Sequence, residues 1–303
     1  MPVCKFGERQ YELAANLELL GGSGSFFAPT TSLEGQLGID VALAPSDQRI
    51  WQLLGIPPPE GVATGTAAFP GWPNDPGLST PFLVSLFIQY KRSSYLTRSY
   101  SNEWGSHKQP YWRVELSSRQ HHLLTQLEAA TAGNAVVRYA APRFWRHEDM
   151  WKYQAIGGVL DNSLLIAPSE IGPNHDHLTW SSGVGLLAHS SPERLHDESP
   201  AGLARAMLRE ATASGQAPER RDPRSYLANL AATVTGLGLP GRRRDQRRED
   251  LSDALVFREV SEEDIGPLAD IATIAEAAGA ARASWLMVSL TRRQTPETPG
   301  AEE

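Results

Sequence analysis

The chain has 303 residues, of which 41% are hydrophobic and 21% charged, as expected for a globular protein with one large domain or a core domain and an accessory one. No apolar run reaches about 18 residues and the N-terminus lacks the apolar segment of a secretory signal, so we expect neither a membrane span nor export. Its single cysteine, Cys4, excludes internal disulfides and cysteine-rich zinc sites. These three observations together predict a cytoplasmic protein.

The formal net charge of −7 is at first unfavourable for a nucleic-acid-binding protein, because phosphates are bound by clustered Lys and Arg. The distribution of charge is less unfavourable than the total. Between Leu86 and Arg146 there are nine basic residues against three acidic ones. Much of the acidity lies in Glu259–Asp270 and near the C-terminus. A local basic face on an acidic protein is therefore expected, although such surface charges are often only solvated.

The first elements are a helix and a short strand, each with an acidic residue on its polar side. Apolar residues spaced for one buried stripe predict a helix over Phe6–Leu20, and Glu8 and Glu12 share one face of it. A Gly/Ser run ends this helix. Alternating apolar residues then predict a strand at Gly38–Leu43, which carries Asp40 on the face opposite the core.

The next strand, at Pro81–Lys91, contains the most informative pattern of the chain. Residues i and i+2 of a strand project to the same face, so Gln89 and Lys91 are expected to point together. Leu86, Ile88 and Tyr90 are expected to pack on the opposite face. The Pro/Gly-rich segment of about 44–81 that precedes this strand is interpreted as a long insertion.

The remaining elements follow from periodicity and from turn residues. They are strands at Tyr111–Leu116 and Asn134–Ala140, a helix at Ser118–Ala130, weaker strands at Val159–Ala167 and Leu178–Ala188, helices at Ala201–Thr212, Tyr226–Leu237 and Ile265–Gly279, and a last strand at Trp285–Leu290. We expect an α/β domain over residues 1–192, and a mostly helical region over 193–303 for oligomerisation or regulation. A disordered tail is expected from about residue 292.

The order of helix, strand, motif strand, helix and strand resembles the PD-(D/E)xK nuclease superfamily. The residues that carry the resemblance are Glu12, Gly38-Ile39-Asp40 and Gln89-Tyr90-Lys91, over roughly residues 6–145. Gln-x-Lys in place of Glu-x-Lys is similar to the Mrr-like variant. The resemblance implies a restriction-endonuclease-like core, a mixed sheet flanked by helices. It also implies that the strands of Asp40 and Gln89 are neighbours, with the insertion looped out between them.

The chemistry of such a site is consistent with these residue types. A hard cation polarises a phosphate and lowers the pKa of its bound water, and Mg²⁺ (or Mn²⁺) prefers oxygen ligands. We expect Asp40 as the principal ligand, Gln89 as a weaker one and Glu12 as a third. Glu34 and Glu8 compete with Glu12 for that part. Lys91 would orient the attacking water and stabilise charge on the phosphate. The expected contacts to the phosphate backbone are Arg92, Arg98 and Lys108.

Two further patterns compete with this interpretation. His175-Asp176-His177 could ligate a transition metal and make the chain a His-dependent metal hydrolase, although ordinary surface histidines are the simpler reading. Tryptophans could stack on nucleic-acid bases, although large aromatic residues more often lie in the core or at its rim. These tryptophans are Trp104, Trp112, Trp145 and Trp151.

The resemblance implies a Mg²⁺- or Mn²⁺-dependent endonuclease acting on DNA, with RNA left open as a substrate. It also implies a restriction or antiphage-defence role. Since two cuts in a duplex need two sites, a homodimer or a complex with a sensor subunit is expected. The alternative is a catalytically inactive subunit that keeps the nuclease fold for nucleic-acid binding or assembly.

Overall fold

The computed structural model describes residues 4–19, 82–213, 222–238 and 262–290. Their helices are α1 (Glu8–Leu19), α4 (Trp104–His107), α5 (Ser118–Ala130), α6 (His147–Ile156), η1 (Pro168–Glu170), α7 (Pro200–Ala213), α8 (Pro223–Gly236) and α10 (Glu262–Ala280). Their strands are β1 (Phe82–Tyr90), β2 (Ser94–Leu96), β3 (Tyr111–Glu115), β4 (Ala135–Pro142), β5 (Ser163–Ile166), β6 (His177–Ser181), β7 (Gly185–His189), β8 (Glu193–Leu195) and β9 (Ser284–Leu290).

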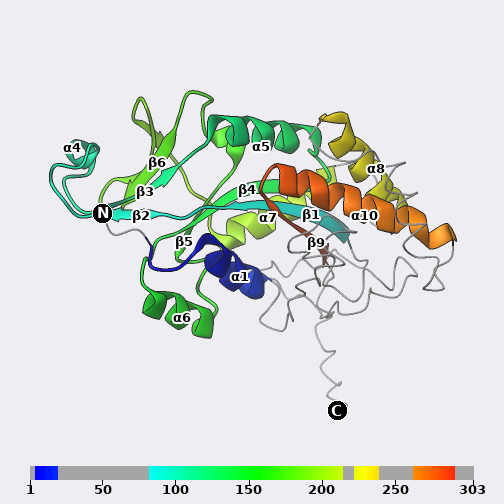
Figure 1. Cartoon of the computed structure of the whole chain (residues 1–303), viewed down its shortest axis with the longest axis horizontal. Helices are drawn as coiled ribbons and strands as arrows, with labels where there is room; N and C mark the ends of the chain where they lie inside the picture. Colours follow the sequence, from blue (N-terminus) through cyan, green and yellow to red (C-terminus); the bar gives the residue numbers. More distant parts are fainter. Residues whose placement is uncertain (1–3, 20–81, 214–221, 239–261, 291–303) are drawn as a thin grey trace, which may run out of the picture.

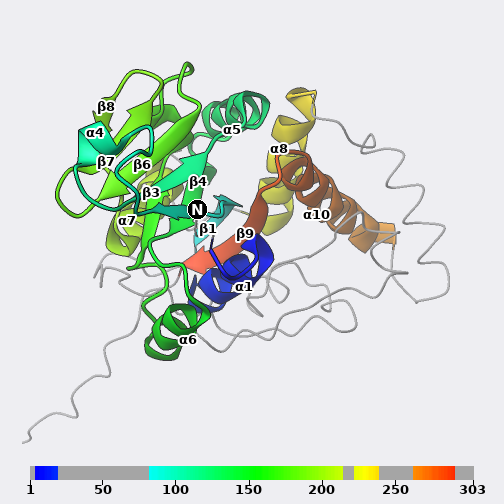
Figure 2. The same cartoon turned by 60° about the vertical axis from the view of Figure 1, so that its left-hand side comes forward.

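The strands form two sheets within an α/β architecture (Figure 1). The first is a mixed four-stranded sheet in the order β5-β4-β1-β9, with β1 parallel to β4 and antiparallel to β9. The second is an antiparallel five-stranded sheet in the order β2-β3-β6-β7-β8. In Figure 2, the second sheet and α4 lie to the left of β1 and β9, and α8 and α10 lie to the right.

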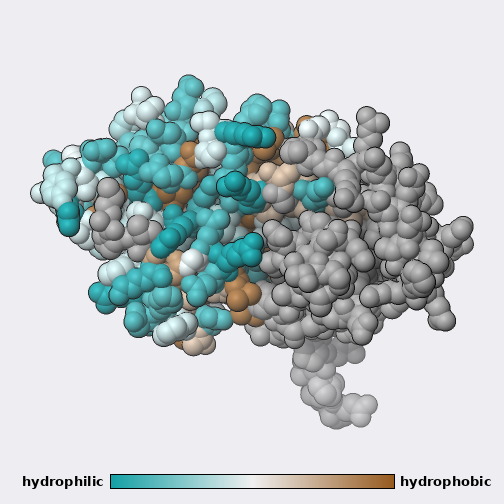
Figure 3. All heavy atoms as spheres, in the orientation of Figure 1, coloured by the Kyte–Doolittle hydropathy of each residue, from teal (hydrophilic) through white to brown (hydrophobic). Residues whose placement is uncertain are grey.

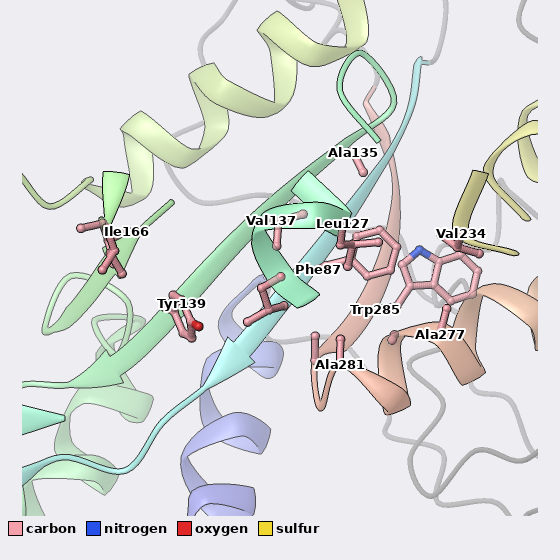
Figure 4. Packing of buried hydrophobic residues seen from close by; sticks show 14 of the residues in the cluster. Phe87, Leu127, Ala135, Val137, Tyr139, Ile166, Val234, Ala277, Ala281 and Trp285 are labelled. Carbon is pink, nitrogen blue, oxygen red and sulfur yellow. The ribbon is translucent and has the colours of Figure 1, made fainter. Parts of the chain in front are cut away.

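Alternation along β1 sends its side chains into two different hydrophobic cores. Leu86, Ile88 and Tyr90 pack with α1 and α7, as the sequence predicts. Phe87 points into the other core, which α5, α8, α10 and the inner face of the five-stranded sheet complete. Figure 4 shows Phe87, Leu127, Val137 and Trp285 together in this second core. The central strand is therefore buried on both faces, which fixes its register and the direction of its polar end.

Several predicted elements are confirmed and some are wrong in detail. Helix α5 begins directly after Ser117, but the Ser117 side chain makes no capping hydrogen bond. The single strand predicted at Leu178–Ala188 is a hairpin, β6 and β7, because Gly185 adopts a positive φ of 83° after the turn. The stretch Val159–Ala167 is a strand only in its second half, as β5.

Within the described residues beyond 192, three helices and two strands are present, in line with a mostly helical region that ends in a strand. β8 extends the five-stranded sheet, and β9 pairs with β1 from Phe82 to Ile88. Helices α8 and α10 contribute to the core that contains Phe87. The predicted role of residues 193–303 in oligomerisation or regulation stays a prediction.

The described surface seen in Figure 3 is mostly hydrophilic, with hydrophobic residues confined to small patches. None of the helices in the described ranges has the length and apolar content needed to cross a membrane.

Candidate active site

The polar end of β1 is held by one side chain from α5. Gln89 is 2% exposed and Lys91 is half-buried. Gln120 Oε1 accepts a hydrogen bond from Lys91 Nζ at 2.5 Å, and Gln120 Nε2 donates to Gln89 Oε1. Gln120 Nε2 also donates to the Ala281 carbonyl at 3.2 Å, just after α10. The amide and the ammonium therefore lie on one side of the sheet, as the alternation predicts.

Helix α1 brings two carboxylates to the same place. Glu12 Oε1 accepts a hydrogen bond from Ser284 Oγ, at the start of β9. Glu8, one turn earlier, lies close enough to Lys91 and Arg282 for each to lower its pKa. Figure 4 shows the end of β1 close to α1 and to the end of α10 at Ala281. Four segments far apart in the sequence thus enclose one polar cluster.

Burial shifts the pKa values of the two ionisable groups at the centre of this cluster toward each other. Burial lowers the pKa of Lys91, and Glu8 partly offsets this effect whereas Arg282 adds to it. Burial raises the pKa of Glu8, and the neighbouring Glu12 raises it further. Opposed shifts of this kind in neighbouring ionisable groups are frequent at catalytic sites.

Two of the predicted acids, Asp40 and Glu34, lie outside the described residues. The place of the Asp40 strand stays a prediction, but the described residues limit where it could pair. Along Ser85–Ile88, β1 is paired with β4 on one edge and with β9 on the other. β1 therefore has no free edge there for the strand Gly38–Leu43, which the resemblance makes its neighbour.

The three predicted phosphate contacts lie in different places. Arg92 is exposed directly beside Lys91, and its Nη2 donates to the Cys4 carbonyl. Arg98 is exposed and its guanidinium lies 5.5 Å from the Tyr100 ring centroid. Lys108 is the left-handed residue that ends α4, with φ 53°. Figure 1 places α4 at one end of the molecule, so only Arg92 adjoins the polar cluster through its position in the chain.

Sequence reasoning missed three members of the cluster, namely Gln120, Arg282 and Ser284. Gln120 occupies a polar position in the first turn of a helix, where a solvated residue is the usual reading. Arg282 belongs to the turn between α10 and β9, and Ser284 is the first residue of β9. This turn reaches α5 at the Gln120–Ala281 contact, across a sequence separation of 161 residues. One local signal exists: Arg282 has a φ of 51°, a left-handed conformation in which glycine is preferred.

In the rival metal site, His175 and His177 lie next to different carboxylates and do not share one. His175 Nε2 lies 3.2 Å from Glu193 Oε2. His177 Nδ1 lies 2.5 Å from Asp176 Oδ1, and its Nε2 lies 3.1 Å from Glu103 Oε1. Within the ranges that the structure describes, no group of three or more His, Cys, Asp or Glu residues has the arrangement of a metal site.

His177 lies beside two other buried histidines, His107 and His189, on the face of the five-stranded sheet that α4 covers. Thr179 Oγ1 lies 2.8 Å from both His107 Nε2 and His189 Nε2. The His189 ring stacks on His177, with centroids 4.7 Å apart and planes 1° apart. His107 has partners at both ring nitrogens, since its Nδ1 also lies 2.9 Å from Ser181 Oγ, whereas the buried Nε2 of His177 has no hydrogen-bond partner among the described residues. Hydrogen-bonded networks of this kind typically stabilise a fold.

These buried histidines predict that stability falls in mild acid. Burial lowers the pKa of His107, His121 and His189 below 6.5, so the folded protein keeps them neutral while the unfolded chain binds protons below that pH. The stabilisation is complete above pH 6.5 and is lost as the pH falls. Going from about pH 7.5 to about pH 6 should cost up to roughly 2 kcal/mol for the three together, measured by urea unfolding.

A matched pair of neighbours controls this measurement. His121 is buried and His122 is exposed. His121→Gln should remove about a third of the pH dependence, whereas His122→Gln, at an exposed position, should change it much less. Equal slopes for His121→Gln and the parent protein would contradict the assignment.

A scan against protein-family models and searches of curated proteins and of solved structures gave no match to this chain. The site is therefore interpreted from its own residues.

Proposed function

We propose that the chain is a divalent-metal-dependent endonuclease that hydrolyses phosphodiester bonds of DNA, on a restriction-endonuclease-like core of the PD-(D/E)xK type. The observation that carries the proposal is the meeting of Gln89, Lys91, Glu8 and Glu12 at the end of β1. The parallel pairing of β1 with β4, with α5 between them in the chain, gives further support.

The donors available at this cluster suit a hard cation. Glu12 offers carboxylate oxygens and Gln89 an amide oxygen, and Asp40 is the third donor proposed from the sequence. These are the ligand types that Mg²⁺ and Mn²⁺ take in proteins, and they include neither sulfur nor imidazole. A bound ion would polarise the phosphate and increase the acidity of its water.

The remaining chemistry falls to the residues around Lys91. The Lys91 ammonium is fixed by Gln120 Oε1 at 2.5 Å, so it is oriented before substrate arrives. Held this way, it stabilises negative charge that develops on the phosphate. Glu8, whose pKa burial raises, is a suitable acceptor for the proton of the attacking water. Gln120 acts through Lys91 and Gln89 and is a positioning residue.

A second candidate function rests on the same hydrogen bonds. The amide of Gln120 accepts a hydrogen bond from Lys91 and donates one to the oxygen of Gln89. Both groups therefore have a hydrogen-bond partner within the protein. This arrangement favours a catalytically inactive subunit that keeps the fold for nucleic-acid binding or assembly. The divided contacts of His175 and His177 provide no comparable support for a His-dependent hydrolase.

The experiment that separates these functions is cleavage of supercoiled plasmid and of RNA by the purified protein in Mg²⁺, Mn²⁺ or EDTA. We expect nicking of plasmid with either metal, none in EDTA, and none by Asp40→Ala with either metal. Cleavage in EDTA would contradict the metal-dependent mechanism. DNA binding without cleavage under all conditions would favour the inactive subunit, and size-exclusion chromatography of the same sample tests the proposed homodimer.

A further inference from the structure

A row of aromatic rings crosses the edge of the five-stranded sheet nearest to Lys91. Trp180, Trp112 and Tyr95 face one another on β6, β3 and β2, because Trp112 pairs with both of the others. The centroids of Trp112 and Trp180 are 6.4 Å apart, and those of Tyr95 and Trp112 are 4.5 Å apart. Trp145, from the loop after β4, continues the row with its ring 6.4 Å from Tyr95 and tilted by 18°.

The row leads from the core to the surface. Trp180 is 4% exposed, whereas Trp112, Tyr95 and Trp145 are half-buried. The inner members are anchored in the hydrophobic core, which Trp112 also contacts. The outer members lie at an edge strand of three residues and in a loop, so parts of their rings remain accessible. Large half-exposed aromatic rings with a rigid inner support are suitable platforms for stacking.

Cations surround the outer end of this row. Lys5 Nζ lies 5.4 Å and Arg146 Cζ 4.9 Å from the Trp145 ring centroid, and both residues are exposed. The segment that carries Lys5 is fixed there, since the Lys5 amide donates to the Trp145 carbonyl at 2.8 Å. Arg92 lies between Lys91 and β2 in the chain, so positive charge continues from the row to the candidate site.

From these observations we infer that Tyr95, Trp112 and Trp145, with Lys5 and Arg146, form a docking surface for unpaired nucleotides. The inference rests on the proposed function, because it makes a single strand, or a locally unpaired one, the substrate that reaches Lys91. Bases offer flat faces for stacking and phosphates offer negative charge to the cations. A duplex presents only its outermost base faces and so fits this surface less well. Ribose and deoxyribose strands share this chemistry.

Binding without cleavage tests the inference independently of catalysis. Fluorescence anisotropy with labelled oligo(dT) of about 20 nucleotides, measured in EDTA on the full chain, should show binding. Trp145→Leu should weaken it by about 10-fold or more, since one base stack contributes about 1–3 kcal/mol. Trp145→Phe should recover most of the affinity. Trp151→Leu is the matched control, because Trp151 is 59% exposed on α6 outside the row, and it should bind like the parent.

The charge component and the strand type are tested with the same assay. Replacing Lys5 and Arg146 together by glutamine should reduce the magnitude of the slope of log affinity against log salt by about 1.4, that is, about 0.7 for each cation removed from a single-strand site. Oligo(U) of the same length distinguishes RNA from DNA as the source of the unpaired bases, and binding of either strand supports the surface. Equal affinities of Trp145→Leu and Trp151→Leu, or duplex DNA bound as tightly as the single strand, would overturn the inference. A protein that binds in this way but never cleaves would contradict only the proposed catalysis.

Discussion

Lys91→Met is expected to lower the rate of metal-dependent plasmid nicking by about 10²- to 10³-fold, the usual loss when one preorganised charge-stabilising group is removed. Methionine keeps most of the length and packing of the side chain, so the fold should persist. The same ammonium predicts a pH dependence. Since burial lowers the pKa of Lys91, activity of the parent should begin to fall at a pH below the ordinary lysine value of 10.5.

Two comparisons make this prediction specific. Lys152→Met removes an exposed lysine of α6 and should leave the nicking rate unchanged. Gln120→Leu keeps Lys91 but removes its hydrogen-bond acceptor, so it should reduce the rate less and displace the alkaline limb of the pH profile. A Lys91→Met protein that is folded by circular dichroism and nicks as fast as Lys152→Met would remove Lys91 from the mechanism.

Phe87→Ala is expected to reduce the free energy of unfolding by about 3–5 kcal/mol, because a fully buried aromatic side chain leaves a large cavity. Phe87 has no exposed surface and points into the core shared by α5, α10 and the five-stranded sheet (Figure 4). A typical domain is stable by only about 5–15 kcal/mol, so the variant should be close to unfolding. Urea unfolding followed by circular dichroism measures the change.

Two controls test the contributions of burial and of side-chain volume. Leu13→Ala truncates an apolar residue of α1 that is 44% exposed, and its cost should be well below that of Phe87→Ala. Phe87→Leu retains much of the volume and should recover a large part of the loss. Similar midpoints for Phe87→Ala and Leu13→Ala would mean that this core does not determine the stability of the chain.

The sequence predicts the helices and strands of this fold better than it predicts which strands pair with one another. Period-two alternation gave the two faces of β1 correctly, because each face meets a different core. Periodicity and turn residues placed α5 and β4 to within a few residues. The pairing of β1 with β9 had no local signal, since strand neighbours are chosen by packing between segments about 200 residues apart, such as Ser85 and Trp285.

In the candidate site, too, some residues are recognisable from the sequence and others only from the tertiary structure. Gln89, Lys91 and Glu12 are recognisable because the residue types, spacing and order resemble a known motif. Gln120 and Arg282 are invisible in the sequence, because their significance comes only from where α5 and the end of α10 are docked. Contacts of this kind depend on tertiary structure and leave no periodic trace along the chain.

Since β9 pairs with β1 and its first residue, Ser284, contacts Glu12, the polar cluster needs segments from both ends of the described chain. During translation, β1 leaves the ribosome long before residues 281–290 have been made. Until then one edge of β1 lacks its final partner and is a site where nascent chains could associate. A growing polypeptide therefore has no assembled cluster, and the nuclease activity that we propose would arise only once synthesis has passed β9.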